Sequence, residues 1–438
     1  MIAQIVFIIA FVSAFGLFFY RLYRIYRYIQ LARHRKTKFR LKRFTRILKI
    51  AIAQSKIFRK PIVGFMHAIV FWGFIIVNIE MLEITIDGIF GTHRSLAFLG
   101  DIYPLLISAF EVFALAVIIA CVVFLARRNI LRLKRFWSKE MTTWPRSDAN
   151  IILITEILLM CSILTMNAAD GILQSRGHAH FPEVGTFLVS SFIQPLFAGM
   201  SDSSLIFLER FAWWFHIIGV LIFMNYVTFS KHLHIFFSFF NVYYSKFEPL
   251  GKMTNMPAIT NEVKLMLNPS ADVPPPAEED MAQFGAKDAF DLYRKNLLDA
   301  FSCTECGRCT AACPANITGK KLSPRKIVMD VRDRVEAIGS KVIKEGKNFN
   351  DNKSLLDLIE QEELWACTSC NACVYECPVN IDPLQVILEL RRYLVLEQGS
   401  APGPINSMFA NIENNGAPWQ YSAEDRLVWT ENLNYKSR

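Results

Sequence analysis

The chain contains five mostly apolar runs that are each long enough to cross a lipid bilayer. A bilayer core needs about 20 such residues per helix. The first run lacks the basic start and the small-residue cleavage site of a signal peptide, so we interpret it as a span. Residues 1–245 are therefore predicted to form a bundle of five transmembrane helices. The predicted helices lie at about residues 1–20, 61–84, 104–126, 149–169 and 206–230.

The two halves of the chain carry opposite charge. The first half, residues 1–250, contains 27 Lys and Arg against 13 Asp and Glu, whereas the second half, residues 251–438, contains 21 against 26. The basic residues gather in segments 21–60 and 127–148, beside the apolar runs. The positive-inside rule places such segments in the cytoplasm. We therefore expect a multi-pass protein of the bacterial inner membrane whose second half is cytoplasmic, and no nucleic-acid partner.

The segment after the first span, RLYRIYRYI at residues 21–29, alternates cationic with apolar and aromatic side chains. This pattern is typical of a helix that lies on anionic lipid. A helical continuation of the first span explains it equally well.

A cysteine motif, C-x2-C-x2-C-x3-C-P, occurs twice in the second half. Three thiolates at this spacing hold three irons of a 4Fe–4S cubane, and the fourth cysteine reaches the neighbouring cluster. Disulfides are not expected in a reducing compartment, and zinc sites rarely show this duplicated spacing. The predicted ligands are Cys303, Cys306, Cys309 and Cys377 for one cluster, and Cys367, Cys370, Cys373 and Cys313 for the other.

The sequence between the two motifs has helical periodicity, as in SPRKIVMDVRDRVEAI, which favours an all-helical ferredoxin. We place this domain at residues 285–400, after a linker at 246–284 and before a tail at 401–438. Cys121 and Cys161 lie inside spans and are interpreted as packing residues. The predicted fold class is mainly α, with a five-helix transmembrane bundle followed by an all-helical two-cluster ferredoxin domain.

Histidines in the spans are candidate haem ligands, because neutral imidazole is a standard axial ligand of haem iron. His67 lies early in the second span, His216 within the fifth, and His234 at the cytoplasmic end of the fifth. The 18 residues from His216 to His234 make about five helical turns, which predicts one face and two depths. The alternative is that each histidine only hydrogen-bonds a neighbouring helix.

His67 and His234 are predicted to share one b haem, because both lie near the cytoplasmic side. His216 is deeper, and the sequence offers it no obvious partner. His93 in an outer loop is a candidate, and a non-histidine ligand or an open position is the alternative. We therefore expect one b haem, with two as the alternative count.

The histidine motifs resemble the cytochrome b (gamma) subunit of respiratory nitrate reductase. They read GFMHAIVFWGF around His67, WWFHIIGV around His216 and SKHLHIF around His234. That family has five spans with haem histidines on the second and fifth, so the resemblance implies the same positions here. The chain departs from the family ten residues after His67, where the family has a second histidine and this sequence reads VNIE at 77–80.

The second half resembles the small ferredoxin-like component of heterodisulfide reductase, HdrC, in CTECGRCTAACPANITGKKLSPRKI and WACTSCNACVYECPVNIDP. Roughly residues 55–435 resemble membrane iron–sulfur oxidoreductases that link electron-transferring flavoproteins or similar donors to menaquinone. In that group a cysteine-rich CCG domain often follows the ferredoxin and carries the substrate-side chemistry. All ten cysteines are already assigned here, so we expect that domain on a separate protein that docks on residues 401–438.

The sequence therefore predicts a membrane-anchored electron-transfer subunit between a cytoplasmic redox partner and the quinone pool. Quinone chemistry needs proton exchange, for which Glu111, Glu80 and His93 are candidates, with packing or helix-end solvation as the alternative. No catalytic residue is assigned. One rival is a membrane-tethered ferredoxin without haem or quinone, acting in docking or redox sensing. Another is a quinone-linked dehydrogenase whose catalysis lies in a partner.

Overall fold

The described chain is built of helices joined by turns and loops. It contains no β-strand in these residues, and one isolated bridge pairs Arg33 with Tyr293. The prediction of a mainly α fold with five membrane-length helices and a helical iron–sulfur domain is confirmed. The computed structural model describes residues 1–35, 37–274, 283–346, 349–422, 424–431 and 433.

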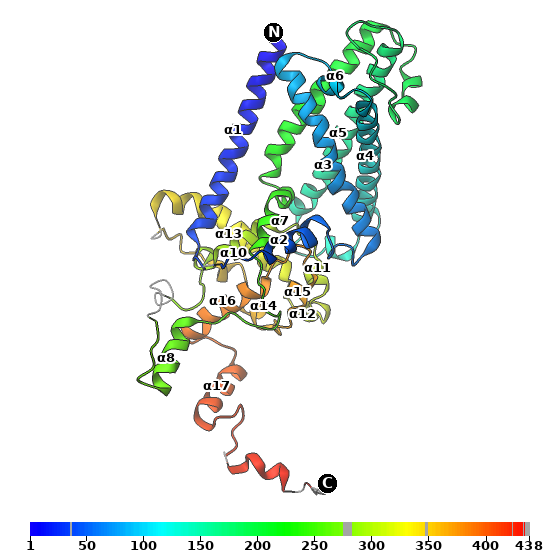
Figure 1. Cartoon of the computed structure of the whole chain (residues 1–438). Coiled ribbons are helices and arrows are strands. Elements are labelled where there is room, and N and C mark those ends of the chain that lie inside the picture. Colours follow the sequence, from blue (N-terminus) through cyan, green and yellow to red (C-terminus); the bar gives the residue numbers. More distant parts are fainter. Residues whose placement is uncertain (36, 275–282, 347–348, 423, 432, 434–438) are drawn as a thin grey trace.

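In the described residues, five helices are long and apolar enough to cross a membrane, and each predicted run overlaps one of them. Figure 1 shows them side by side, with the N-terminus at the end of the bundle farthest from the second half. Large apolar side chains such as Ile62, Leu105 and Phe207 are exposed on this bundle, as lipid-facing positions require. The helices are α1 (Ile2–Leu31), α3 (Pro61–Phe90), α4 (Ile102–Leu125), α5 (Thr143–Ser175) and α6 (Asp202–Val227).

Neighbouring helices of the bundle approach closely at glycine. A Cβ atom at Gly73 of α3 would lie 2.6 Å from the Val117 side chain of α4. One at Gly219 of α6 would lie 2.7 Å from the Leu159 side chain of α5. Small residues at such contacts let membrane helices gain packing energy.

The first helix is longer than the span predicted at residues 1–20. α1 continues without a break through RLYRIYRYI to Leu31, so the structure favours the interpretation of that segment as a helical continuation. At its end, Ile25 and Tyr28 are buried in the same apolar core as Leu297 and Val331 of the second half. The bundle and the second half therefore share part of one core.

The helices of the second half surround the cysteine motifs. The longest begins at Pro324, whose missing N–H would be unpaired in a first turn, and is capped by Ser323, which accepts from the Lys326 amide. Ile327 and Val331 on its inner face are fully buried. These helices are α10 (Arg294–Ser302), α11 (Arg308–Ala311), α12 (Pro314–Ile317), α13 (Pro324–Glu345), α14 (Gln361–Trp365), α15 (Ala372–Glu376) and α16 (Pro383–Leu396).

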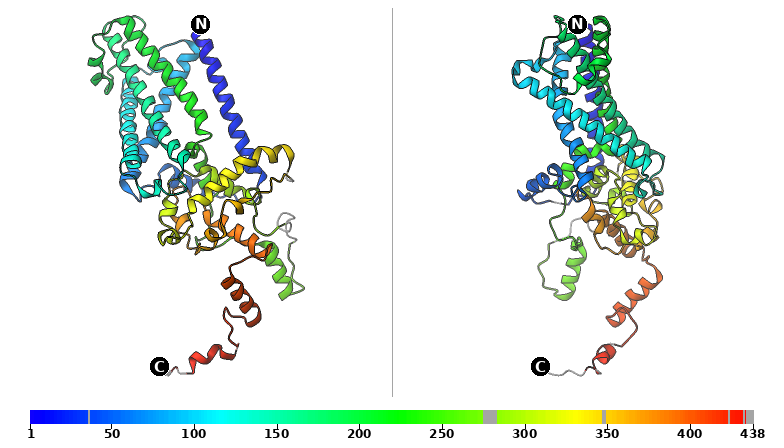
Figure 2. Two further views of the ribbon diagram at one scale, coloured as in Figure 1. Left: turned by 180° about the vertical axis from the view of Figure 1, so that it is seen from behind. Right: turned by 90° about the vertical axis from the view of Figure 1, so that its right-hand side faces the viewer.

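Two segments outside these domains are also helical. The segment 246–284, predicted to be a linker, contains α8 (Pro257–Leu267), while residues 275–282 within it lie outside the described chain. Beyond α16 the tail forms α17 (Gly403–Asn415), which buries none of its residues. Figure 2 shows this tail projecting away from the rest of the molecule.

Candidate iron–sulfur and haem sites

Four of the predicted cluster ligands line one small cavity in the second half. Cys313, Cys367, Cys370 and Cys373 surround it, together with apolar residues such as Leu384 of α16. Cys313 belongs to the first motif, and the other three belong to the second. The fold thus brings the exchanged fourth cysteine to the loop of three, as the predicted ligand set requires.

The other four predicted ligands also lie near one another. Burial, and then the neighbouring thiols of Cys306, Cys303 and Cys377, raise the pKa of Cys309 well above its ordinary value. Cys377 comes from the second motif and the other three from the first. The eight cysteines are therefore gathered in the two predicted groups, and their role as ligands stays a prediction.

The two motif loops follow the same backbone course. Glu305 and Gly307 in the first loop have φ angles of 53° and 70°, and Ser369 and Asn371 at the same positions in the second have 56° and 60°. Glycine enters this left-handed region without steric cost, and asparagine tolerates it better than most residues. The matching turns give both loops the curvature that gathers their cysteines.

Backbone amides donate to three of the cysteine sulfurs. Hydrogen bonds to sulfur are one means by which proteins set the reduction potential of a cluster. The three bonds run from Glu305 to Cys303 Sγ at 3.4 Å, from Ser369 to Cys367 Sγ at 3.4 Å and from Ile381 to Cys377 Sγ at 3.2 Å.

The chemistry of these cysteines fits iron–sulfur clusters. All ten cysteines are described, and none is in a disulfide. In the described chain no three His, Cys, Asp or Glu side chains lie close enough together to hold a single metal ion. The ligands of a cubane are farther apart, because they surround four irons. Burial raises the pKa of Cys303 to about 12 and that of Cys377 to about 11. Their thiolates therefore need a compensating positive charge such as bound iron.

His67 on α3 and His234 at the start of α7 (His234–Tyr243) lie near each other, with ring centres 6.5 Å apart. The Nδ1 atoms lie 2.9 Å from Gln54 Oε1 and 3.1 Å from the Lys231 carbonyl oxygen, respectively. Both contacts place a hydrogen on Nδ1 and leave the Nε2 lone pair free, as in metal-binding histidines. Burial also lowers the pKa of His234 to about 4, which keeps its imidazole neutral.

His216 and His234 do not share one regular helix. α6 ends at Val227, a 3-10 turn covers Lys231–Leu233, and α7 begins at His234. The predicted phase relation of five continuous turns is therefore wrong. Because of this break, His234 lies near His67. The helical phase of His216 and His234 alone did not predict that approach.

His216 is buried between α3, α5 and α6. Its Nδ1 lies 3.0 Å from the Leu159 carbonyl oxygen and 3.1 Å from Ser162 Oγ, both on α5. Its Nε2 lies 3.1 Å from Met81 Sδ on α3. The sequence analysis did not identify Met81, because a methionine within an apolar run is typical of core packing.

His93 has other partners, in a polar cluster on the far side of the bundle from the second half. Its Nε2 lies 3.4 Å from an Asp170 oxygen, and its ring stacks on His180 with centres 5.6 Å apart. Arg94 donates to Asp170 at 2.8 Å in the same cluster. His93 is not among the described hydrogen-bond contacts of His216, which are with Ser162, Leu159 and Met81.

The same cluster holds two of the predicted proton-exchange acids, in contrasting environments. Glu111 accepts from the Val189 and Ser190 amides at 2.7 and 3.2 Å. Glu80 is only 1% exposed, yet neither of its oxygens has a hydrogen-bond partner in the described chain. Arg94 lies 3.9 Å away as an ion-pair partner. Glu111 is thus a satisfied structural group, whereas Glu80 keeps free capacity to bind a proton.

The second half docks on the loop that precedes α3. Lys56 donates to the Cys377 carbonyl oxygen at 3.1 Å, and Arg308 donates to the Lys56 carbonyl oxygen at 3.3 Å. Two residues before Lys56, Gln54 contacts His67. One short loop therefore contacts both a predicted haem ligand and a predicted cluster ligand.

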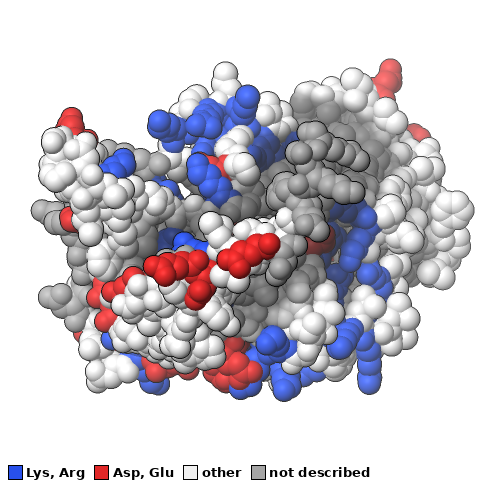
Figure 3. All heavy atoms as spheres, turned by 90° about the horizontal axis from the view of Figure 1, so that it is seen from below, with Lys and Arg blue, Asp and Glu red and all other residues white. Residues whose placement is uncertain are grey.

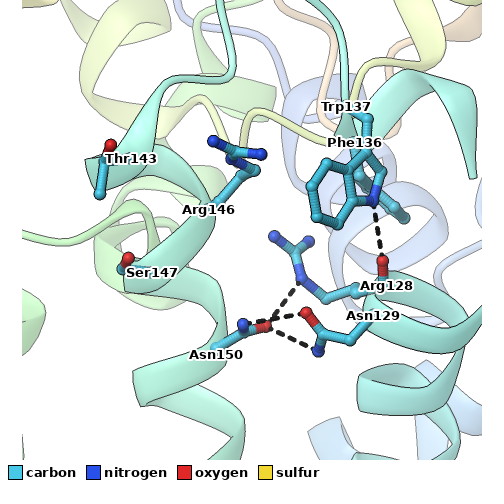
Figure 4. A pocket seen from close by; sticks show the side chains of 8 residues that line it. All are labelled: Arg128, Asn129, Phe136, Trp137, Thr143, Arg146, Ser147 and Asn150. Atoms are coloured by element: carbon cyan, nitrogen blue, oxygen red, sulfur yellow. Dashed lines mark hydrogen bonds between the residues drawn. The ribbon is translucent and has the colours of Figure 1, made fainter. Parts of the chain in front are cut away.

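A further cavity lies near the basic end of α4 and α5 (Figure 4). Asn150 Oδ1 accepts from Asn129 at 3.2 Å, and Trp137 donates to the Arg128 carbonyl oxygen at 3.0 Å. The Arg146 guanidinium lies 4.7 Å from the Trp137 ring centre. None of the predicted cysteine or histidine ligands lines this cavity, so it is separate from the redox sites.

The fold and the cysteine geometry define a class: a membrane-length helical bundle that carries a helical iron–sulfur domain. Residues 302–381 match the family model described as a 4Fe-4S dicluster domain. The match covers both cysteine motifs.

Longer relatives match most of the chain. The probable iron-sulfur-binding oxidoreductase FadF of Bacillus subtilis is 28% identical over 98% of this chain and 60% of its own length. The EtfAB:quinone oxidoreductase of Syntrophomonas wolfei is 27% identical over 87% of this chain and 53% of its own length. This chain thus spans little more than half the length of these two relatives. No solved structure is significantly similar to it.

The second half has relatives of its own. The HdrC component of a CoB-CoM heterodisulfide reductase from Methanosarcina acetivorans is 32% identical over 26% of this chain and 56% of its own length. The predicted similarities to HdrC and to membrane iron–sulfur oxidoreductases are confirmed. The likeness of the first half to the nitrate reductase gamma protein stays a prediction.

Proposed function

We propose that this chain is the membrane subunit of an oxidoreductase and moves electrons between a cytoplasmic redox protein and quinone in the bilayer. The main support for this proposal is one loop, in which Gln54 contacts His67 and Lys56 contacts Cys377. It makes a short connection between the membrane site and the nearer cysteine group. The name of one relative, an EtfAB:quinone oxidoreductase, supports quinone as the membrane partner.

In this proposal the two cysteine groups hold two 4Fe–4S clusters, and His67 with His234 holds a b haem. When bound, these groups supply one-electron transfer. The chain positions their ligands: the Glu305 and Ser369 amides fix cysteine sulfurs. Gln54 fixes the ring of His67 in the same way.

The sidedness that we propose follows from charge. The basic segments 21–60 and 127–148 lie at the end of the bundle that carries the second half (Figure 1). This end then faces the cytoplasm of a bacterial inner membrane. Figure 3 shows acidic side chains across the middle of the face turned away from the bundle. A soluble redox partner would meet this face.

Partner docking is also proposed for the tail, residues 401–438. Trp419, Tyr421 and Trp429 there are each more than half exposed. Exposed aromatic side chains on a projecting segment are typical of a protein interface. The partner that we propose is a flavoprotein or a protein with a CCG domain, and the name of the EtfAB:quinone oxidoreductase supports the former.

The proton that accompanies quinone chemistry is assigned to Glu80 rather than Glu111. Glu80 is buried without a hydrogen-bond partner in the described chain, and intramembrane acids of this kind mark proton routes. The amides that hold Glu111 give that residue a structural explanation.

The first test is a dithionite-reduced minus oxidised optical spectrum of the purified full chain, with haem and iron counted per protein. We expect b-type bands and about eight non-haem irons, the content of two cubanes. Full iron without haem would contradict the quinone route and leave a membrane-tethered ferredoxin. A chain without iron would contradict the whole proposal.

A further inference from the structure

The cavity near the basic end of α4 and α5 is lined by side chains from two parts of the chain. Its volume is about 160 Å³, several times the space that one water molecule needs. On one side are Arg146, Ser147 and Asn150 of α5, and on the other are Arg128 and Trp137 from the segment that follows α4. No acidic side chain lines the cavity. Its charge is therefore positive.

The two guanidinium groups of this cavity leave most of their donors unused. Arginine has five N–H donors and no acceptor. In the described chain, Arg128 donates only through Nε, to Asn150 Oδ1 at 3.4 Å. Arg146 likewise donates only through Nε, to the Thr142 carbonyl oxygen at 3.3 Å. Figure 4 shows both guanidinium groups directed into the space between α5 and the Trp137 ring.

The acids of the surrounding segment do not neutralise these arginines. Segment 127–148 contains seven Lys and Arg but only two acids, Glu140 and Asp148. Glu140 pairs with Arg325, and Asp148 pairs with Lys231. Within the described chain, neither cavity arginine has an ion-pair partner of its own.

Contacts on both sides hold the two arginines in this one small site. Asn129 and Asn150 exchange hydrogen bonds at 3.2 and 3.1 Å, which join the end of α4 to α5. Trp137 donates to the Arg128 carbonyl oxygen at 3.0 Å, and its ring centre lies 4.7 Å from the Arg146 guanidinium. Like charges that are held together repel each other, so the arrangement favours an anion between them.

The residues beside the cavity are suited to a lipid. Ile130 and Leu131 are 77% and 65% exposed, and Trp144 at the start of α5 is 52% exposed. Exposed apolar side chains at the end of a span can contact acyl chains, and tryptophan gathers at the level of the lipid headgroups. Basic segments next to a span attract anionic lipids. A phosphate group at this place would thus belong to a phospholipid.

We propose that this cavity binds the phosphate group of an anionic phospholipid, with Arg128 and Arg146 as its two cationic ligands. The planar guanidinium matches the paired oxygens of a phosphate, and such charged hydrogen bonds are stronger than neutral ones. The hydroxyl groups of Thr143 and Ser147 also line the cavity and can donate to the same oxygens. The inference needs only that the bundle lies in a membrane, and it does not depend on haem or quinone.

A bound headgroup would also stabilise the segment on which the second half docks. Arg325 of α13 donates to the Arg135 carbonyl oxygen at 2.6 Å, and to that of Glu305 in the first cysteine loop at 3.3 Å. Arg135 lies two residues before Trp137. A ligand that binds only the folded state stabilises it, so bound lipid should raise the unfolding temperature of the chain.

The test titrates the purified full chain in a non-ionic detergent with phosphatidylglycerol, phosphatidylcholine or inorganic phosphate. Bound lipid is counted by native mass spectrometry, and thermal unfolding is followed at each ratio. The variants are Arg128→Gln, Arg146→Gln and the control Arg127→Gln, and circular dichroism compares their folding with that of the parent. Arg127 is on the same helical turn as Arg128 and does not line the cavity.

We expect one tightly held phosphatidylglycerol per chain, weaker binding of the uncharged phosphatidylcholine and no stabilisation by inorganic phosphate. Arg128→Gln and Arg146→Gln should each weaken phosphatidylglycerol binding by about tenfold or more, as the loss of one charged hydrogen bond predicts. Arg127→Gln should bind like the parent. An equal loss in Arg127→Gln, or parent-like binding in both cavity variants, would overturn the cavity as the site. Stabilisation by inorganic phosphate equal to that by lipid would overturn the lipid as its ligand.

Discussion

The exchanged cysteines allow a test at the scale of single residues. Cys377→Ser should remove the cluster assigned to the first motif and leave the one assigned to the second, although Cys377 belongs to the second motif in sequence. The reason is its place beside Cys309. Iron should fall from about eight to about four per chain, measured with the spectrum of the reduced protein.

Cys161→Ser is the matched control, because Cys161 is an exposed free cysteine on α5. Its iron content should equal that of the parent chain. If Cys377→Ser instead destroyed only the cluster that includes Cys370, the exchange of fourth ligands would be refuted.

Glu80 and Glu111 are expected to respond differently to the same change. Glu80→Gln should slow quinol turnover while cluster and haem spectra stay at parent values, because it removes a proton-binding group that has no hydrogen-bond partner in the described chain. In Glu111→Gln, the new NH2 group faces either the Val189 and Ser190 amides or the Asn167 side-chain amide, so donors meet a donor instead of an acceptor. It should therefore lower thermal stability. Equal turnover in the parent and Glu80→Gln would exclude Glu80 from the proton route.

For single residues, the sequence predicts candidate ligands whose spacing along the chain is characteristic. It misses residues that are recognised only by what they contact in the fold. The spacing of the cysteines identified both groups, and the position of His67 in its span identified it as a ligand candidate. Gln54 and Met81 could not be found in that way. Their roles depend on how α3 packs against a loop and against α6, and no sequence period records that packing.

Among the helices, the junction between α1 and α13 gives the clearest mutational test. A Cβ atom at Gly339 would lie 2.6 Å from the Tyr28 ring. Gly339→Val should push the end of α1 off α13 and destabilise the chain by about 1–3 kcal/mol, as expected for overpacking. Thermal unfolding and limited proteolysis near residue 31 would measure this change.

Gly16→Val on α1 is the control, because a Cβ atom there meets nothing within 4 Å. It should leave both measurements close to those of the parent chain. Parent-like proteolysis of Gly339→Val would show that α1 and α13 do not pack as described.

The helical elements themselves were predicted well where apolar runs are long, and less well where they end. The fifth span was expected to run to residue 230, but α6 stops at Val227. Asp148 on α5 accepts from Ser230 Oγ at 2.6 Å and from the Lys231 amide at 3.1 Å. This tertiary contact ends the helix in a stretch without Pro or Gly, which local propensity does not reveal.

Over the whole molecule, a buried ion pair joins the two halves. Lys231 of the membrane half pairs with Glu305 of the second half, and both side chains are at least nine-tenths buried. Lys231→Met leaves Glu305 with Arg332 as its remaining ion-pair partner. It should lower the free energy of unfolding by ~1–3 kcal/mol, measured by thermal denaturation in detergent.

Lys321→Met provides the comparison, because Lys321 forms its ion pairs with Glu360 and Glu362 on the surface of the second half. Exposed pairs contribute little, so this variant should unfold like the parent. Equal stability of both variants would show that the Lys231 contact does not join the halves energetically.

The tail supplies a test of assembly. A chain truncated after residue 400 should lose co-purification with its soluble redox partner and keep parent cluster spectra, since α17 buries none of its residues against the rest. Retained co-purification would contradict docking on residues 401–438. It would place the docking surface within residues 1–400.

The length of α1 has a mechanical consequence. Its 30 residues extend about 45 Å, against a bilayer core of about 30 Å. The surplus turns extend beyond that thickness, and Ile25 and Tyr28 there are buried in the core of the second half. One continuous helix therefore holds the iron–sulfur domain at a fixed distance from the lipid. The domain is not attached by a flexible linker that would let it move between donor and membrane. Diffusing partners must come to it, so turnover should depend on their concentration and not on the freedom of any hinge.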